Sequence, residues 1–126
     1  MSTPIQTVEN TIAEKLREIT GLTVYEVRPA HALVLPSATL TLILGRMHGG
    51  FPDAMQYLDL VMQIDVWSRT ESQMRDLADK VLMKLYQART EMGFIDIALV
   101  NMRDLPEEEV WRRYLYFRIE TTVSKS

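Results

Sequence analysis

The stretch that decides the fold is Tyr57–Leu85, which reads YLDLVMQIDVWSRTESQMRDLADKVLMKL. Up to Trp67 it places an apolar residue at every second position, which is typical of a β-strand that buries one face. Beyond Trp67 the apolar residues recur at helical spacing, so an amphipathic helix follows the strand. The run Ser68–Glu71 has the form of a capping box and predicts that the helix begins there and ends near Gly93.

Upstream, the sequence predicts a helix and a short strand. Thr3, Pro4 and Gln6 form a second capping box with proline at the first helical position, and apolar residues then recur at helical spacing as far as Thr20. Gly21 is placed to end this helix, because glycine enters the left-handed conformation freely. The segment 22–28 follows as a short strand that ends before Pro29.

A second strand is predicted over Ala38–Gly45, with Leu40, Leu42 and Leu44 on its buried face. The segment Met47–Ala54 contains two adjacent glycines and a proline, so we expect a loop between the second and third strands.

Downstream of the central helix, two further strands are predicted over Ile95–Met102 and Val110–Val123, with a charged turn at Arg103–Glu109 between them. The element order is therefore helix, three strands, helix, two strands. Two amphipathic helices suffice to cover one face of a sheet. We therefore predict one two-layer α+β domain over residues 1–126, with a mostly antiparallel sheet of about five strands.

The composition is that of an ordinary globular domain. The chain has 126 residues, of which 47% are hydrophobic and 25% charged, and its net charge of -3 gives no global attraction to nucleic acid or anionic lipid. It has no cysteine, which excludes disulfides and thiolate chemistry and fits a protein that folds in a reducing cytoplasm. No secretion signal or apolar run of membrane-spanning length is evident, so no membrane association is expected.

The sequence nominates no catalytic, cofactor-binding or metal-binding residues. Its two histidines, His31 and His48, lack the spacing of a metal site, and no phosphate-binding glycine pattern occurs. Asp59 and Asp65 lie on one face of the third strand but roughly 20 Å apart, too far to share a proton. We therefore expect a protein that is not an enzyme; an unrecognised small enzyme would need a convergent polar pocket.

The last strand carries Arg112, Tyr114, Tyr116 and Arg118, all predicted to lie on the face opposite the core. Three interpretations stay open. Basic and aromatic residues interleaved on a sheet can stack single-stranded bases. The arginines can instead pair across strands with the two aspartates of the third strand. The face, with its aromatic side chains, can also form a protein interface.

Three local features stand out: an N-terminal helix leading into Val24-Tyr25 and Pro29, the run Asp65-Val66-Trp67-Ser68 ahead of a long helix, and an arginine-bearing final strand. In these features and in the order of its elements, most of the chain resembles the phage tail terminator, or tail completion, family. Proteins of this family cap the finished tail tube and join it to the head. The turn at Arg103–Glu109 departs from the family's usual aspartate-glycine turn.

The resemblance implies a homohexameric ring in the tail or neck of the virion, assembled in the host cytoplasm. The ring would stack on the last ring of tail tube protein, with head-completion or neck proteins above it. DNA would pass through its lumen without specific binding. A neighbouring neck protein is the alternative within this class.

Two segments, Arg46–Ala54 and Arg103–Glu109, are expected to reach neighbouring rings. Together with the sheet face they supply the candidate interaction residues, which are Arg46, His48, Phe51, Tyr57, Trp67, Arg103, Asp104, Glu108, Arg112, Tyr114, Tyr116 and Arg118.

Overall fold

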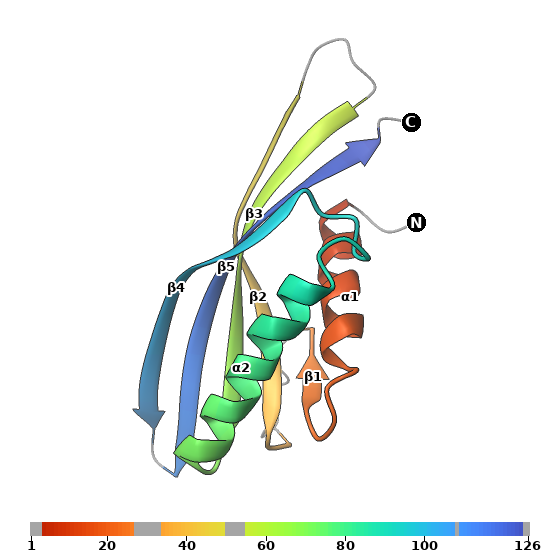
Figure 1. The fold of residues 1–126 in the computed structure, drawn as a ribbon. Coiled ribbons are helices and arrows are strands. Elements are labelled where there is room, and N and C mark those ends of the chain that lie inside the picture. The colour runs from red at the N-terminus through yellow and green to blue at the C-terminus, as the bar shows by residue number, and fades with distance from the viewer. Residues whose placement is uncertain (1–3, 27–33, 50–54, 108, 125–126) are drawn as a thin grey trace.

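The computed structural model describes residues 4–26, 34–49, 55–107 and 109–124. Two helices pack on one face of a five-stranded sheet (Figure 1), which confirms the predicted two-layer α+β fold and its element order. The elements are α1 (Pro4–Leu16), β1 (Thr23–Tyr25), β2 (Ser37–Gly49), β3 (Met55–Ser68), α2 (Glu71–Gln87), β4 (Asp96–Glu107) and β5 (Val110–Ser124).

The strands lie in the order β1-β2-β3-β5-β4, so β3 is the central strand. It pairs with β5 in one unbroken antiparallel register, from Met55 opposite Ser124 to Ser68 opposite Trp111. Only the short pair of β1 and β2 is parallel. The sheet is therefore mostly antiparallel, as predicted, and its longest pairing lies at its centre.

The core lies between the sheet and the two helices. Strand β3 supplies the alternating residues predicted for its buried face, and all of them are at most 2% exposed. β5 adds a row of apolar side chains beside them, and apolar side chains of the two helices complete the core. The largest side chains of this core are Phe117, Ile12, Leu16, Leu58, Leu60, Met62, Ile64, Met74, Leu85, Ile97, Leu115 and Ile119.

The predicted alternation of β2 is wrong beyond Leu42. A β-bulge between Leu42 and Leu44 shifts the register by one residue, so Leu44 lies opposite Val61, on the face away from the helices. Leu42, also predicted to be buried, is 36% exposed, and Leu44 is 53% exposed. The strand also continues to Gly49, so the first part of the predicted loop at Met47–Ala54 is strand. Residues 50–54 of that loop lie outside the described residues.

Both helix predictions need corrections at their ends, and α2 stops at Gln87 rather than near Gly93. Helix α1 ends at Leu16, and the residues up to Gly21 form turns; Gly21 has the left-handed φ of +83° that was predicted for it. Helix α2 is capped by Thr70, whose hydroxyl accepts the Gln73 backbone N–H, so the capping box begins two residues later than predicted. Ser68 is instead a buried residue at the end of β3.

The predicted charged turn at Arg103–Glu109 is mostly strand. β4 runs through Glu107 and pairs with β5 as far as Val110, so a tight hairpin replaces the turn. Glu109 adopts a φ of +64°, an uncommon conformation for a residue with a side chain. The predicted first strand is likewise reduced to Thr23–Tyr25; its last residues, 27 and 28, lie outside the described part.

Candidate interaction surface

The open face of the sheet, opposite the helices, carries most of the predicted interaction residues. The last strand was predicted to place two arginines and two tyrosines on this face. That orientation is confirmed, because each of the four lies across from a β3 residue of the same face. The pairs are Arg112 with Trp67, Tyr114 with Asp65, Tyr116 with Gln63, and Arg118 with Val61. Helices α1 and α2 cover only the other face (Figure 1), so in the described part of the chain no helix shields these residues.

Arg112 is the centre of a compact group on this face, the Arg112 cluster. Its guanidinium lies 2.7 Å from Asp65 Oδ2 and 4.1 Å from the ring centroids of both Trp67 and Tyr114. The Trp67 indole N–H donates to the Thr39 hydroxyl on β2 at 3.2 Å. These side chains therefore tie the three adjacent strands β2, β3 and β5 together.

The Arg112 cluster is buried although it lies outside the main core. The side chain of Asp65 is 4% exposed and that of Arg112 is 14% exposed. A charge so far removed from water needs a partner, which each residue supplies to the other, and the aromatic rings on both sides add cation–π attraction. Trp67, predicted as an exposed aromatic contact, is only 3% exposed and has a structural role here.

Arg118 forms a second cross-strand pair, with Asp59. Two hydrogen bonds of 3.1 and 3.0 Å join its Nε and Nη2 to the two carboxylate oxygens, and Glu120 lies 3.1 Å away. The hydrogen bonds to Asp59 raise the pKa of Arg118, and the charge of Glu120 acts in the same direction. The pairing of both arginines with the aspartates of β3 is therefore confirmed. Both cations that single-stranded nucleic acid would need are already neutralised.

Tyr114 and Tyr116 lie side by side between these two pairs. Their ring centroids are 6.4 Å apart at an interplanar angle of 19°, and both side chains are half-buried. Tyr57, farther along β3, is 44% exposed. The open face therefore exposes less aromatic surface than predicted, because Trp67 is buried and Tyr114 and Tyr116 are half-buried.

The remaining predicted residues lie toward the edges of the sheet. Arg46 is exposed on β2 opposite Asp59, and Arg103 is exposed on β4 opposite Tyr114. His48 lies in β2 opposite Tyr57, but its side chain is outside the described part. Phe51 and Glu108 also lie outside the described residues.

Asp104 points to the helix-covered face, where it pairs with Arg113. Arg113 donates from Nε and Nη2 to the two carboxylate oxygens at 2.6 and 3.0 Å. These hydrogen bonds hold the pKa of Asp104 below its ordinary value and raise that of Arg113. Sequence reasoning missed Arg113, which is only 8% exposed. The signal was present, because the alternation of the last strand places this arginine in the apolar row.

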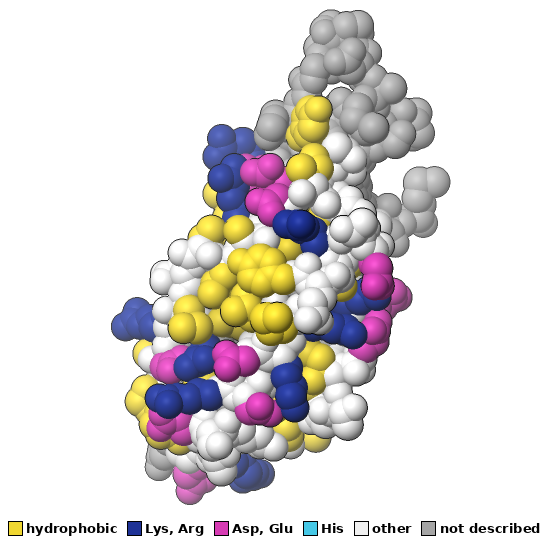
Figure 2. Space-filling model, viewed as in Figure 1, with side chains coloured by type: hydrophobic (Ala, Val, Ile, Leu, Met, Phe, Trp, Pro, Cys, Tyr) yellow, Lys and Arg dark blue, Asp and Glu magenta, His cyan; other side chains and the backbone are white. Residues whose placement is uncertain are grey.

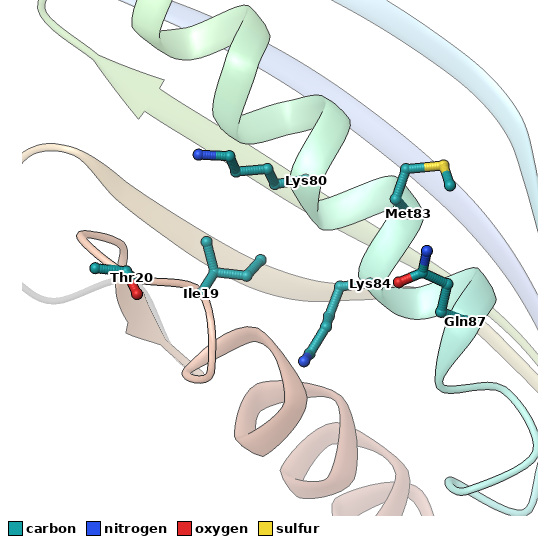
Figure 3. A pocket seen from close by; sticks show the side chains of 6 residues that line it. All are labelled: Ile19, Thr20, Lys80, Met83, Lys84 and Gln87. Atoms are coloured by element: carbon teal, nitrogen blue, oxygen red, sulfur yellow. The ribbon is translucent and has the colours of Figure 1, made fainter.

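A shallow groove of about 340 Å³ lies between α2 and the turn that follows α1 (Figure 3). Its two lysines already have partners: Lys84 lies 2.7 Å from Glu18, and Lys80 lies 3.1 Å from Asp76. The described residues contain no group of three or more acidic or histidine side chains that could hold a metal ion. None of the described helices is long and apolar enough to cross a membrane.

No protein-family model and no curated protein matches the sequence. The structure, however, is similar to a chain in a solved structure described as the virion of a native gene transfer agent particle. The TM-score is 0.68 at 14% sequence identity, over 98% of this chain and 100% of that chain. At this identity the likeness shows a shared fold, and it extends over nearly all of this chain and the whole of the other.

Removing one partner of the buried pair is expected to cost far more stability than removing one partner of the exposed pair. Asp65→Ala leaves the Arg112 charge buried without its carboxylate and should lower the free energy of unfolding by about 3 kcal/mol. Asp59→Ala is the matched control, because it removes an aspartate from the same face of the same strand. Urea unfolding of both variants measures the difference; equal losses would contradict a structural role for the Arg112 cluster.

The Asp104–Arg113 pair is expected to stabilise the fold only while Asp104 is ionised. The folded pKa of Asp104 lies below its ordinary value of 3.8, so the contribution is complete above that pH and is lost as the pH falls through the folded pKa. Asp104→Asn should therefore be less stable than the natural chain at pH 7 but equally stable near the acid limit.

Urea unfolding at several pH values tests this expectation. Asp76→Asn, which alters an exposed pair within α2, is the control and should leave the stability nearly unchanged throughout. A difference between Asp104→Asn and the natural chain that did not depend on pH would contradict the assignment.

Proposed function

We propose that this chain is a structural virion protein that closes the end of a phage tail tube as a ring and presents a docking surface for the head. The observation that carries the proposal is the fold shared, end to end, with a chain of the gene transfer agent virion. The element order and the local runs that resemble the tail terminator family point to the same class of protein.

The chemistry of the surface agrees with a structural role. The charged residues of the open face are combined into pairs, Arg112 with Asp65 and Arg118 with Asp59, rather than directed into a pocket. Paired charges rigidify a sheet and leave its aromatic and apolar parts for contacts between proteins. We therefore propose no enzymatic activity, cofactor or specific binding of DNA for this chain.

The proposed partners follow from the position at the end of a tail. One face of the ring would contact the tail tube protein, and the other would contact head-completion or neck proteins. The acidic net charge of -3 favours a lumen through which DNA slides without being held. A neighbouring neck protein is the alternative assignment, since it would share the virion location and the need for a ring.

The purified chain is expected to form closed rings at high concentration, with a mass of six copies. Native mass spectrometry measures the number of copies, and negative-stain microscopy shows whether the particles are annular with a central hole. A protein that stays monomeric at the highest attainable concentration would contradict the proposal.

Deleting the gene separates the two assignments within the virion class. If the chain ends tail growth, the producing strain should assemble tail tubes of uncontrolled length without attached heads. If it is instead a neck protein, tails should keep their normal length and only the joining of heads should fail. Electron microscopy of lysates gives tube length and head attachment in one experiment.

A further inference from the structure

The sheet has two open edges among the described residues. β4 lies at one end of the strand order, and no described strand pairs with its outer side. At the other end β1 pairs only with Ser37–Thr39, so the rest of β2, from Leu40 to Gly49, also forms an edge. Open edges of this length are exceptional unless they are protected or occupied.

Exposed apolar side chains gather along both edges. Leu42, Ile43 and Leu44 at the bulge of β2 are 36%, 50% and 53% exposed. On the opposite side, Figure 2 shows an apolar patch over α2 and β4. The exposed apolar residues of these two elements are Met83, Tyr86, Val100 and Met102. Contiguous apolar surface on a folded protein marks a contact site more often than isolated apolar residues do.

One cross-strand row of the sheet carries opposite charges at its two ends. The row runs over the open face from Arg46 on β2 through Asp59 and Glu120 to Asp96 on β4. It begins with the exposed cation Arg46 at one edge and ends at the other with Asp96, an exposed anion that also lies 3.6 Å from Arg89 of its own copy. Two copies placed side by side in the same orientation therefore bring Arg46 of one against Asp96 of the next.

The strand directions and side chains suit such a contact. Because β2, β3, β5 and β4 alternate in direction, β2 of one copy runs antiparallel to β4 of its neighbour. With Arg46 opposite Asp96, the same antiparallel register places Leu44 opposite Ala98 and Leu42 opposite Val100. Charged residues then meet charges of opposite sign, and apolar residues meet apolar ones.

We propose that the Leu40–Gly49 edge of β2 packs against the β4 edge of a second copy of this chain, head to tail. The proposal rests on the ring of the proposed function and names its subunit contact. Because the two edges differ, the contact is heterologous, and repeating it either closes a ring or continues as a filament. In this contact Leu44 meets Ala98 on the open face, and Leu42 meets Val100 beside the apolar patch over α2 and β4.

The isolated chain already caps part of the β4 edge. The Tyr86 hydroxyl accepts the Leu99 N–H at 3.2 Å, and the Met102 N–H donates to the Asn101 side chain at 2.9 Å. Such caps reduce indiscriminate pairing with other strands. Specificity for a second copy then comes from the side chains of the two edges.

Charge reversal tests the contact. Arg46→Glu and Asp96→Arg should each weaken assembly at least about tenfold, because each places like charges together at every interface. An equimolar mixture of the two variants should assemble again, since every contact between unlike copies then joins opposite charges. Native mass spectrometry should show complexes in which the two variants alternate. Thermal unfolding of each variant alone confirms that it is folded.

Engineered cysteines provide a test that does not depend on weakening the protein. The natural chain has no cysteine. Leu44 and Ala98 lie on strands separated by β3 and β5 within one copy, roughly 14 Å apart, so a disulfide between them must join two copies. Oxidising the Leu44→Cys/Ala98→Cys variant should give a ladder of covalent multimers. The control Leu44→Cys/Thr20→Cys, with its second cysteine in the turn after α1 that lines the groove of Figure 3, should not.

The outcomes separate this proposal from the proposed function. Rings that survive both charge reversals and give no ladder would overturn the β2–β4 contact and leave the ring itself standing. A natural chain that stays monomeric and a cysteine variant without a ladder would overturn both. Rescue by the mixture together with the ladder would establish the contact.

Discussion

The pairing of β3 with β5 is the interaction on which the rest of the structure depends. These two strands are joined without a bulge, and the two long outer strands, β2 and β4, each pair with one of them. β2 extends from β3, and β4 extends from β5. α2 packs on the apolar rows that the pair presents, and α1 packs against α2 and β1. An unbroken central register fixes which face each neighbouring side chain occupies.

That register gives the two faces of the sheet different means of burying their side chains. The helix side buries apolar rows in the ordinary way and admits one ion pair, Arg113 with Asp104, where the sheet reaches its edge. On the open side, none of the described helices forms a covering layer. There the larger side chains pack on one another, and Arg112 lies between two aromatic rings while its charge is matched by Asp65. Burial on this side therefore comes from side chains alone.

The same architecture leaves strand edges and apolar side chains exposed at both sides of the sheet. A two-helix layer cannot reach both ends of a five-stranded sheet, and β1 is too short to cover the length of β2. A repeating assembly needs complementary surfaces at its two sides. Here the two bulged strands carry exposed apolar residues, and one cross-strand row has charges of opposite sign at its ends. The proposed ring thus follows from the geometry that leaves the monomer incomplete at its sides.

The sequence by itself determined the element order, the two-layer fold and the faces of β3 and β5. These features follow from local periodicity, which depends only on the backbone repeat of helix and strand. The pairing of the arginines with Asp59 and Asp65 was one of three open interpretations, which the structure decided. Only the tertiary structure decided where that periodicity breaks. The bulge that turns Leu44 outward, the strand that replaces the turn at Arg103–Glu109, and the burial of Trp67 under Arg112 arise from register and contacts between distant strands. Such long-range pairing leaves no mark within a short stretch of sequence.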